Sequence, residues 1–325
     1  AHTIKNRDTK MSAAAMQLRA GARIALTGTP IQNNLSELWN IFQFINPGLL
    51  DSFDKFSERY ISGQFAQQNV KRLKNVIRPF VLRRKKSDVI EELPDKTEIF
   101  RKVELSDLET AAYEASRASQ ELETSEKIDI NALAEITRLR EAACSISLVK
   151  KGWSGNESKI EAAIDIIRNV IDSGNRILVF SQFTSFLSKV RDRLGHEESF
   201  YLDGTTPIKK RSLMVQDFQN GINKVFFISL KAGGLGLNLT GANYVLHLDP
   251  WWNPAVEAQA TDRTYRIGQN KNVTVHRLIT LGTFEEKIDE ILKNKQKIVD
   301  MSLYTGETML GDLSNEELME IFKLR

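Results

Sequence analysis

The sequence contains very little cysteine and histidine. Its 325 residues include one cysteine, Cys144, and four scattered histidines. This content excludes a disulfide framework within the chain and a cysteine-rich zinc site, and the histidines show no metal-ligand spacing. We therefore expect no metal site built by this chain alone. We interpret Cys144 as a small buried hydrophobic residue rather than a reactive thiol.

Long apolar runs are also missing. No run approaches the ~20 residues that a membrane-spanning helix needs, so we expect no membrane partner. The N-terminus shows no signal-peptide pattern. The chain begins with Ala1 rather than methionine, so residue 1 is either a natural start or a cut point. A reducing intracellular compartment fits the cysteine content, which means the cytoplasm in a bacterium and the nucleus in a eukaryote.

The size and charge of the chain leave several functions open. A hydrophobic content of 41% over this length is enough for two domains with cores of their own. The net charge of +3 is too small to imply a nucleic-acid partner. Any electrostatic argument must therefore rest on local clusters, and the oligomeric state cannot be inferred.

Strands and helices alternate in the second half of the chain. The strands are expected at 176–181, 199–202, 224–230, 244–248 and 273–280, and the helices at 158–172, 184–194, 207–219, 254–265 and 284–299. Such alternation implies parallel strands with right-handed crossovers. The strand segments are apolar without alternation, as expected when both faces are covered. We predict an α/β fold with a doubly wound parallel sheet, whose ligands bind beyond the carboxyl ends of the strands.

The first half of the chain is less regular. Apolar runs and helical spacing predict a short buried strand at 22–26, a helix at 35–45, less regular helices over 51–82, a strand at 97–105 and helices over 106–145. A Gly-containing segment at 152–156 is expected to be a linker.

Two positively charged side chains stand out on the helix that begins at Pro254. Gln259, Arg263 and Arg266 are spaced i, i+4 and i+7, which places them on one helical face. Two guanidinium groups that point the same way form a strong anion clamp, and arginine fingers of this kind stabilise charge on a phosphoryl group during its transfer. A solvated basic helix face would have the same spacing.

A glycine-rich segment directly follows the strand expected at 224–230. It runs from Ser229 to Leu239, and its glycines would allow backbone N–H groups to approach phosphate oxygens closely. The segment matches neither the Walker pattern nor the dinucleotide fingerprint, and no G-x-x-x-x-G-K-[ST] occurs anywhere in the chain. A tight turn between a strand and a helix would also account for the glycines.

Four segments in a fixed order carry a family resemblance. They are LTGTPIQN at 26–33, SLKAGGLGLNLT at 229–240, DPWWNP at 249–254 and DRTYRIGQ at 262–269. Together they resemble the Swi/Snf-like branch of helicase superfamily two, over nearly the whole chain. In that family, two RecA-like lobes close over ATP and Mg²⁺ and move along double-stranded DNA. The resemblance therefore implies a RecA-like lobe, with double-stranded DNA and the first lobe of the same parent protein as partners.

The resemblance also implies a division of the chain. Residues 1–105 correspond to the end of the first lobe with a helical insertion at about 52–90, residues 106–156 to a helical protrusion and linker, residues 157–300 to the second lobe, and residues 301–325 to a C-terminal helical extension. Ala1 and His2 resemble the last two letters of the DEAH box. The Mg²⁺ ligands and the phosphate-binding loop are then expected upstream of residue 1.

Site residues follow from the matched motifs. Arg263 and Arg266 resemble the catalytic arginine fingers. The ATP-binding positions are Gly234, Gly236, Asn238, Gln259, Arg263 and Arg266. The DNA-binding positions are Gly204, Thr205, Ser229, Lys231, Gly233 and Trp252. The positions that couple the ATP site to the interlobe contact are Thr27, Gly28, Thr29, Gln32 and Asn33.

We therefore expect the C-terminal portion of an ATP-driven translocase or remodeller of double-stranded DNA, unable to hydrolyse ATP by itself because the phosphate-binding half is missing. The alternative is an ATP-independent module that docks on DNA or on a protein. An upstream Walker motif in the same reading frame would separate the two. An RNA helicase of the same superfamily fits the Trp-Trp segment and the helical insertions less well.

Overall fold

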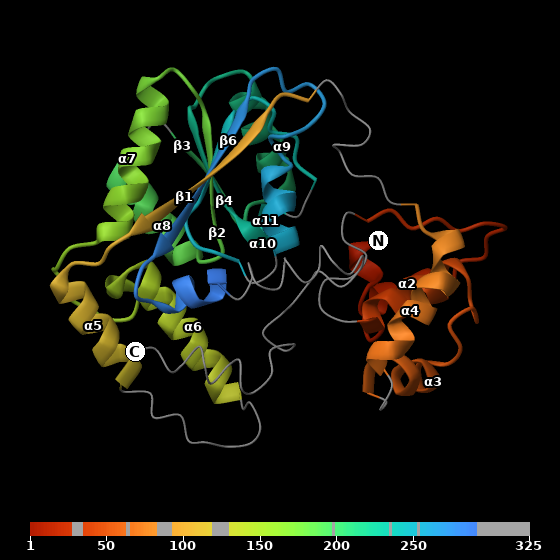
Figure 1. Ribbon diagram of the computed structural model, residues 1–325. Coiled ribbons are helices and arrows are strands. Elements are labelled where there is room, and N and C mark those ends of the chain that lie inside the picture. Colours follow the sequence, from red (N-terminus) through yellow and green to blue (C-terminus); the bar gives the residue numbers. More distant parts are fainter. Residues whose placement is uncertain are drawn as a thin grey trace. The chain divides into compact units, whose positions relative to one another are not determined.

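The computed structural model describes residues 1–27, 35–62, 66–82, 93–118, 130–196, 199–233, 236–251 and 254–290. Within them the chain forms two compact units, one up to residue 82 and the other from residue 93 (Figure 1). None of the helices in these ranges combines the length and apolarity that crossing a membrane requires.

Helices build the first unit. Its elements are η1 (His2–Ile4), α1 (Lys10–Met16), α2 (Leu35–Ile45), α3 (Phe53–Ser57), the π-helical η2 (Glu58–Ser62), α4 (Ala66–Ile77) and η3 (Arg78–Phe80). The apolar face predicted for the helix at 35–45 is confirmed, because Leu38 and Phe42 are buried against Phe56 and Leu73. Packing of this amphipathic face, more than helix propensity, stabilises such short helices.

The buried strand expected at 22–26 is wrong. These residues have no regular secondary structure, and the side chains of Ile24 and Leu26 are 80% and 82% exposed. A strand needs a neighbour to satisfy its backbone groups, and the described residues of this unit contain no strand. The Leu26 carbonyl instead accepts a hydrogen bond from the amino group of Ala1 at 2.7 Å.

A six-stranded sheet forms the centre of the second unit. Its strands are β1 (Lys96–Val103), β2 (Ile177–Ser181), β3 (Ser199–Leu202), β4 (Val225–Ser229), β5 (Tyr244–His247) and β6 (Val273–Thr280). Their order across the sheet is β1-β6-β5-β2-β4-β3, and every pair is parallel. The predicted parallel α/β architecture is thereby confirmed.

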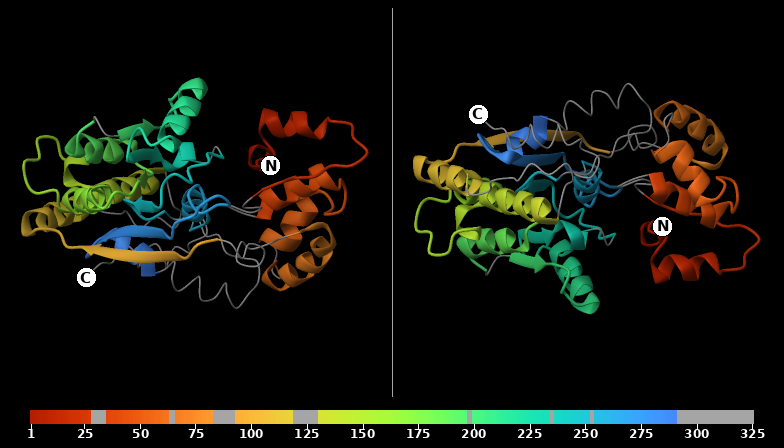
Figure 2. Two further views of the ribbon diagram at one scale, coloured as in Figure 1. Left: turned by 90° about the horizontal axis from the view of Figure 1, so that it is seen from above. Right: turned by 90° about the horizontal axis from the view of Figure 1, so that it is seen from below.

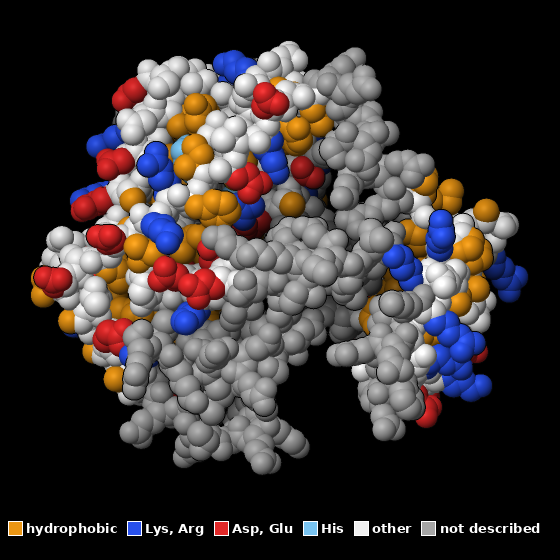
Figure 3. All heavy atoms as spheres, in the orientation of Figure 1, with side chains coloured by type: hydrophobic (Ala, Val, Ile, Leu, Met, Phe, Trp, Pro, Cys, Tyr) orange, Lys and Arg blue, Asp and Glu red, His pale blue; other side chains and the backbone are white. Residues whose placement is uncertain are grey.

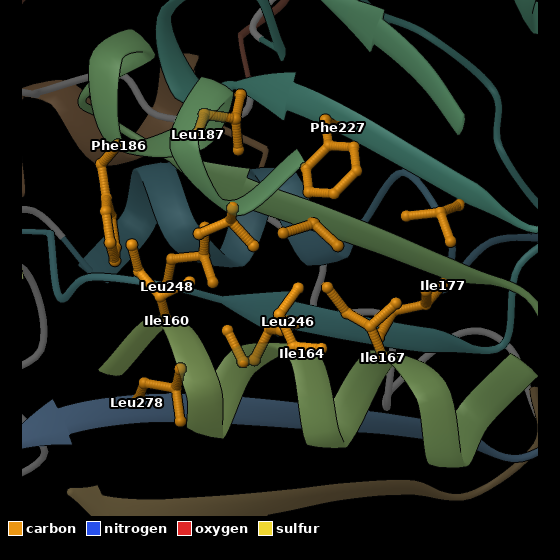
Figure 4. Close-up of a cluster of buried hydrophobic side chains, with 14 of the residues drawn as sticks. Ile160, Ile164, Ile167, Ile177, Phe186, Leu187, Phe227, Leu246, Leu248 and Leu278 are labelled. Carbon is orange, nitrogen blue, oxygen red and sulfur yellow. The ribbon is translucent and has the colours of Figure 1, made fainter. Parts of the chain in front are cut away.

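Helices cover both faces of this sheet. In Figure 1, α7 (Ser158–Asp172) and α8 (Thr184–Leu194) lie on one side, and α9 (Ile208–Gln219), α10 (Leu230–Gly233) and α11 (Pro254–Thr261) on the other. Successive strand residues therefore enter different cores. Val225 and Phe227 pack with α7 and α8 (Figure 4), whereas Phe226 and Ile228 pack on the opposite side. This explains the uninterrupted apolar run of β4.

β1 precedes the boundary expected at residue 105, and in the structure it belongs to the second unit. All eight of its residues pair with β6, from Lys96 beside Val273 to Val103 beside Thr280. Figure 2 shows the orange β1 along the margin of the sheet, next to the blue β6. The compact units divide at residues 91 and 92 instead. Each residue of β1 lies 177 positions before its partner in β6, so no local sequence pattern predicts this pairing.

The predicted helices over 106–145 correspond to α5 (Asp107–Ala118) and α6 (Ile130–Cys144), which are followed by η5 (Ile146–Leu148). Glu109 of α5 is 2% exposed and accepts hydrogen bonds from the backbone N–H and the hydroxyl of Ser158, at the start of α7. Thr280 at the end of β6 donates its hydroxyl hydrogen to the carbonyl of Ala143 at 2.9 Å. The helix pair is therefore fixed to the sheet by buried polar contacts.

The last described helix spans residues 284–290, and Thr283 and Glu286 cap its start. The hydroxyl of Thr283 accepts from the N–H of Glu285 at 3.2 Å, and the carboxylate of Glu286 accepts from the N–H of Gly282 at 2.9 Å. Both contacts satisfy backbone N–H groups at the start of the helix, as in a capping box whose contacts are displaced by one residue along the chain. The C-terminal helical extension expected at 301–325 lies outside the described residues.

Candidate functional site

Polar residues follow several strands at the carboxyl edge of the sheet. Ser181 ends β2, Asp203 follows β3, Ser229 ends β4 and Asp249 follows β5. Because all strands are parallel, these residues lie along one edge, where open α/β sheets bind their ligands. Figure 3 shows acidic and basic side chains interspersed over the visible face of the second unit, so no single-sign patch marks the site on this face.

The turn after β3 is organised by Asp203. Its carboxylate accepts hydrogen bonds from the N–H of Thr205 at 2.9 Å and from the Thr205 hydroxyl at 2.7 Å. The hydrogen bond from the Thr205 hydroxyl lowers the pKa of Asp203 most, and the bond from the Thr205 N–H lowers it further. Burial opposes both effects. Gly204 and Thr205 are exposed, and Arg211 donates to the Gly204 carbonyl at 3.1 Å. The predicted DNA-contacting turn is therefore rigid and open to solvent.

Asp203 was not among the predicted site residues. The signal was present, because an Asp followed by Gly, Thr and Thr favours a turn in which the carboxylate binds backbone N–H groups two residues on.

The glycine-rich segment begins with a short helix. Ser229 is 2% exposed, and its hydroxyl accepts a hydrogen bond from the N–H of Ala232 at 3.4 Å, which caps α10. Gly236 has a φ of +72°, a conformation that side chains with a Cβ rarely adopt. Both Gly236 and Asn238 are exposed. The glycines thus allow the chain to turn back from the end of β4 toward the start of β5.

The helical stripe of Gln259, Arg263 and Arg266 is wrong, because α11 ends at Thr261. The N–H of Arg263 bonds the Ala260 carbonyl and the N–H of Thr264 bonds the Thr261 carbonyl, which are i→i−3 contacts of a tightening turn. The carbonyl of Arg263 accepts instead from the N–H of Leu239 at 2.9 Å. A long-range backbone contact thus ends a helix that its sequence would continue.

Arg263 and Arg266 nevertheless remain neighbours. The Arg263 side chain is 6% exposed, and its Nε has no hydrogen-bond partner among the described residues. Burial lowers the pKa of Arg263, the Arg266 guanidinium lowers it further, and Asp262 opposes both effects. The Nε of Arg266 donates to the Asp262 carbonyl at 2.8 Å. Two cations held this close favour the binding of an anion between them.

Gln269 joins the arginine turn to the end of the glycine-rich segment. It is 5% exposed, and its amide donates to the carbonyls of Thr240 at 3.1 Å, Ala242 at 2.7 Å and Thr264 at 3.3 Å. The structure therefore joins the end of the glycine-rich segment, at Leu239 and Thr240, to the turn that carries Arg263 and Arg266. Gln269 was missed because an isolated Gln carries no signal of burial.

Several predicted residues cannot be placed. The residues outside the described ranges are Gly28, Thr29, Gln32, Asn33, Gly234 and Trp252. The backbone of Lys231 and Gly233 lies in α10, and the side chain of Lys231 is not described. Thr27 lies in the first unit and is partly exposed, and Gln259 is partly exposed on α11.

The donor set favours an anion over a metal ion. Within the part of the chain that the structure describes, no three His, Cys, Asp or Glu side chains gather in a possible metal site. The Nε of Arg263, buried beside Arg266 and without a partner among the residues that the structure describes, could instead donate to an anion such as a phosphate. No Mg²⁺ ligand can be assigned to the described residues.

Comparison with known proteins gives the family. The model of the SNF2-related domain matches residues 1–148, and that of the helicase conserved C-terminal domain matches residues 158–268. The solved "Sulfolobus solfataricus SWI2/SNF2 ATPase core in complex with dsDNA" is 35% identical, covering 99% of this chain and 71% of that chain, with a TM-score of 0.59. The chain belongs to the SWI2/SNF2 family of ATPases.

Curated relatives of this SWI2/SNF2 chain are longer. A "Putative ATP-dependent helicase/translocase YwqA" of Bacillus subtilis is 37% identical over 100% of this chain and 37% of its own length. An "Uncharacterized ATP-dependent helicase" of Mycoplasma pneumoniae is 38% identical over 99% of this chain and 32% of its own length. The chain thus spans about a third of each relative.

Proposed function

We propose that this SWI2/SNF2 chain is the C-terminal portion of an ATP-driven motor that translocates on or remodels double-stranded DNA. Its own contribution is a pair of arginines for the terminal phosphate of ATP, together with contacts to the DNA backbone. The observation that carries the proposal is the buried Arg263 beside Arg266, because its Nε has no hydrogen-bond partner within the described part of the chain. A buried N–H without a hydrogen-bond partner is costly, and an oxygen of a phosphoryl group would supply that partner together with a counter-charge.

The arrangement supports distinct roles for the residues. ATP, when bound, supplies the phosphoryl group that is transferred to water. Arg263 and Arg266 offset the negative charge of that group, while Gln259, Gly234, Gly236 and Asn238 line the nucleotide site. The tie from the Leu239 N–H to the Arg263 carbonyl couples the glycine-rich segment to the arginines.

The proposed DNA contacts come from segments that follow three strands. Gly204 and Thr205 lie in the exposed turn after β3, and Lys231 and Gly233 lie in α10 after β4. Trp252 follows β5 in the sequence. We infer that Ser229, whose hydroxyl is buried, acts by shaping α10 and not by direct contact. Contacts to phosphates carry no sequence information, so binding is expected to be sequence-independent and to weaken with salt.

The proposal also covers the coupling between lobes and the activity of the chain by itself. Thr27, Gly28, Thr29, Gln32 and Asn33 are proposed to couple the ATP site to the contact between lobes. We propose that this chain of 325 residues does not hydrolyse ATP by itself, because its sequence has no G-x-x-x-x-G-K-[ST] loop to hold the phosphates of ATP.

The test joins the chain to the part of a motor that it lacks. The upstream region of the Bacillus subtilis relative is fused to residue 1, and ATP hydrolysis is measured with and without duplex DNA. Arg266→Ala is expected to lower DNA-stimulated turnover by about 10³-fold or more while duplex affinity stays nearly unchanged. Arg168→Ala, at an exposed position of α7, is the matched control.

Two outcomes contradict the proposal. Unchanged turnover in Arg266→Ala refutes the arginine-finger role. A fusion that binds duplex DNA but never hydrolyses ATP favours the alternative function, an ATP-independent binding module.

A further inference from the structure

The loop of residues 249–251 is held from several directions. Asp249 is 2% exposed, and its carboxylate accepts hydrogen bonds from the Ser181 hydroxyl at 2.5 Å and from the Gln182 N–H at 3.4 Å. Both donors lie at the end of β2. The start of the loop is thereby fixed to the centre of the sheet.

A second set of contacts fixes the loop to α11 and to the margin of the sheet. Glu257 of α11 is 2% exposed and accepts a hydrogen bond from the N–H of Trp251 at 2.7 Å. The same carboxylate forms an ion pair with Arg277 of β6. Arg277 in turn lies 3.3 Å from the carboxylate of Glu98 on β1. The end of the loop is thereby fixed to two neighbouring strands.

The third hold comes from outside the sheet. Arg140 of α6 donates to the carbonyl of Pro250 at 3.3 Å, across 110 positions of the sequence. Its side chain is 7% exposed, and its guanidinium lies 5.4 Å above the ring of Phe183. Burial lowers the pKa of Arg140 to about 10, while Asp249 opposes that effect, so the side chain is still charged at neutral pH.

Burying the Arg140 guanidinium against a backbone carbonyl carries a desolvation penalty. An apolar side chain would fill the same space without the desolvation penalty. A guanidinium, in contrast, fixes direction as well as distance through its planar set of donors. The loop it contacts leads into α11 and, beyond it, to the turn of Arg263 and Arg266.

We propose that Arg140 is a positioning residue, through which α6 fixes the 249–251 loop so that the residues after it meet duplex DNA. The inference rests on the proposed function, because it takes duplex DNA as the ligand of this loop. Arg140 does not touch DNA in this scheme. It acts through the Pro250 carbonyl, and its loss loosens the loop without unfolding the sheet.

Tryptophan fluorescence can report on this loop directly. The four tryptophans are Trp39, Trp153, Trp251 and Trp252. Replacing the first two by phenylalanine leaves reporters only at the loop. Acrylamide quenching of the full chain then measures loop exposure, anisotropy of a labelled duplex measures affinity, and thermal unfolding measures stability.

Three variants and one control are compared in this background. Arg140→Met removes the donor, Arg140→Lys keeps the charge, and Ser181→Ala removes the opposite hold on Asp249 without touching α6. Arg138→Met is the matched control, because Arg138 is exposed on the same helix and its loss changes the net charge equally. Long-range attraction to DNA therefore falls by the same amount in both Met variants.

Arg140→Met is expected to raise the quenching constant about twofold and to weaken duplex affinity by up to about tenfold, the scale of one charge-assisted hydrogen bond. Ser181→Ala should shift both readouts in the same direction, and Arg140→Lys should recover part of the affinity. Arg138→Met should leave the quenching constant unchanged and lose only the small share of affinity that follows from the removed charge. Quenching and affinity of Arg140→Met equal to those of Arg138→Met overturn the inference, even if the melting temperature falls.

The outcome separates the inference from the proposed function. A background chain that does not bind duplex DNA refutes the DNA-binding role, whereas the quenching comparison still tests whether Arg140 holds the loop. If Arg140→Met fails to fold, Ser181→Ala decides: unchanged quenching and affinity there overturn the role of the held loop.

Discussion

Lys159 and Glu285 form an ion pair that is almost completely removed from solvent. Their side chains are 1% and 2% exposed, and the Lys159 ammonium lies 2.5 Å from the Glu285 carboxylate. Burial alone would lower the pKa of Lys159, and the adjacent Glu285 reverses that direction and raises it. The carboxylate also accepts from the Thr280 N–H at 2.9 Å, and the Cys144 thiol lies 3.6 Å away. The pair therefore joins α6, α7, the end of β6 and the last described helix.

Because the pair is buried, replacing either Lys159 or Glu285 should lower the free energy of unfolding strongly. Removing one member of a buried pair leaves an uncompensated charge, which costs about 3–5 kcal/mol. We expect a loss of about that size for Lys159→Met. For Glu285→Gln we expect about 3 kcal/mol, because the amide oxygen can still accept from the Thr280 N–H. The double variant removes both charges, fills the space with a side chain of similar length, and should lose only about 1 kcal/mol.

The assay is urea unfolding of the full chain with Trp39 replaced by phenylalanine. The remaining tryptophans, at 153, 251 and 252, all lie in the second unit, so their fluorescence follows that unit alone. Lys96→Met is the control, because its pair with Glu98 is 37% and 32% exposed. That exposed pair should contribute no more than about 1 kcal/mol.

Two results would refute the reasoning. One is a loss below about 1 kcal/mol in each single variant, the size expected of an exposed pair. The other is a double variant that loses the sum of the two single losses, because independent sites add whereas a coupled pair does not.

Two further predictions concern buried polar groups of the same unit. Burial, followed by the neighbouring Arg277, lowers the pKa of His247 well below 6.5, so that below this pH the unfolded chain binds a proton that the folded chain does not. The free energy of unfolding is therefore expected to fall by about 1.4 kcal/mol from pH 7.5 to 5.5. His247→Gln should remove that part of the pH dependence, as measured by urea unfolding at the two pH values. The same pH dependence in the variant would contradict this account. Gln269→Ala removes the donor to three carbonyls and should lower the free energy of unfolding by about 1–3 kcal/mol. Gln269→Glu should lower it more, because a carboxylate cannot donate to these carbonyls. Equal losses for the two variants in chemical denaturation would exclude the donor role.

Much of the second unit follows from local sequence. The apolar runs of β2 and β4 and the spacing of α7 and α8 are dictated by which residues must leave water, and the structure places these elements within a residue of their predicted bounds. The motif strings were sufficient to indicate the SWI2/SNF2 family. Gly236 adopts the positive φ that a glycine-rich turn favours.

Tertiary structure decided the rest. The pairing of β1 with β6, the end of α11 at Thr261 and the contact of Arg140 with Pro250 all join residues far apart in sequence. Residues 22–26 have the composition of a strand but no neighbouring strand among the described residues of their unit. Periodicity records which face of an element is apolar. It does not record which distant backbone group completes a hydrogen bond, and that is settled only when the chain packs.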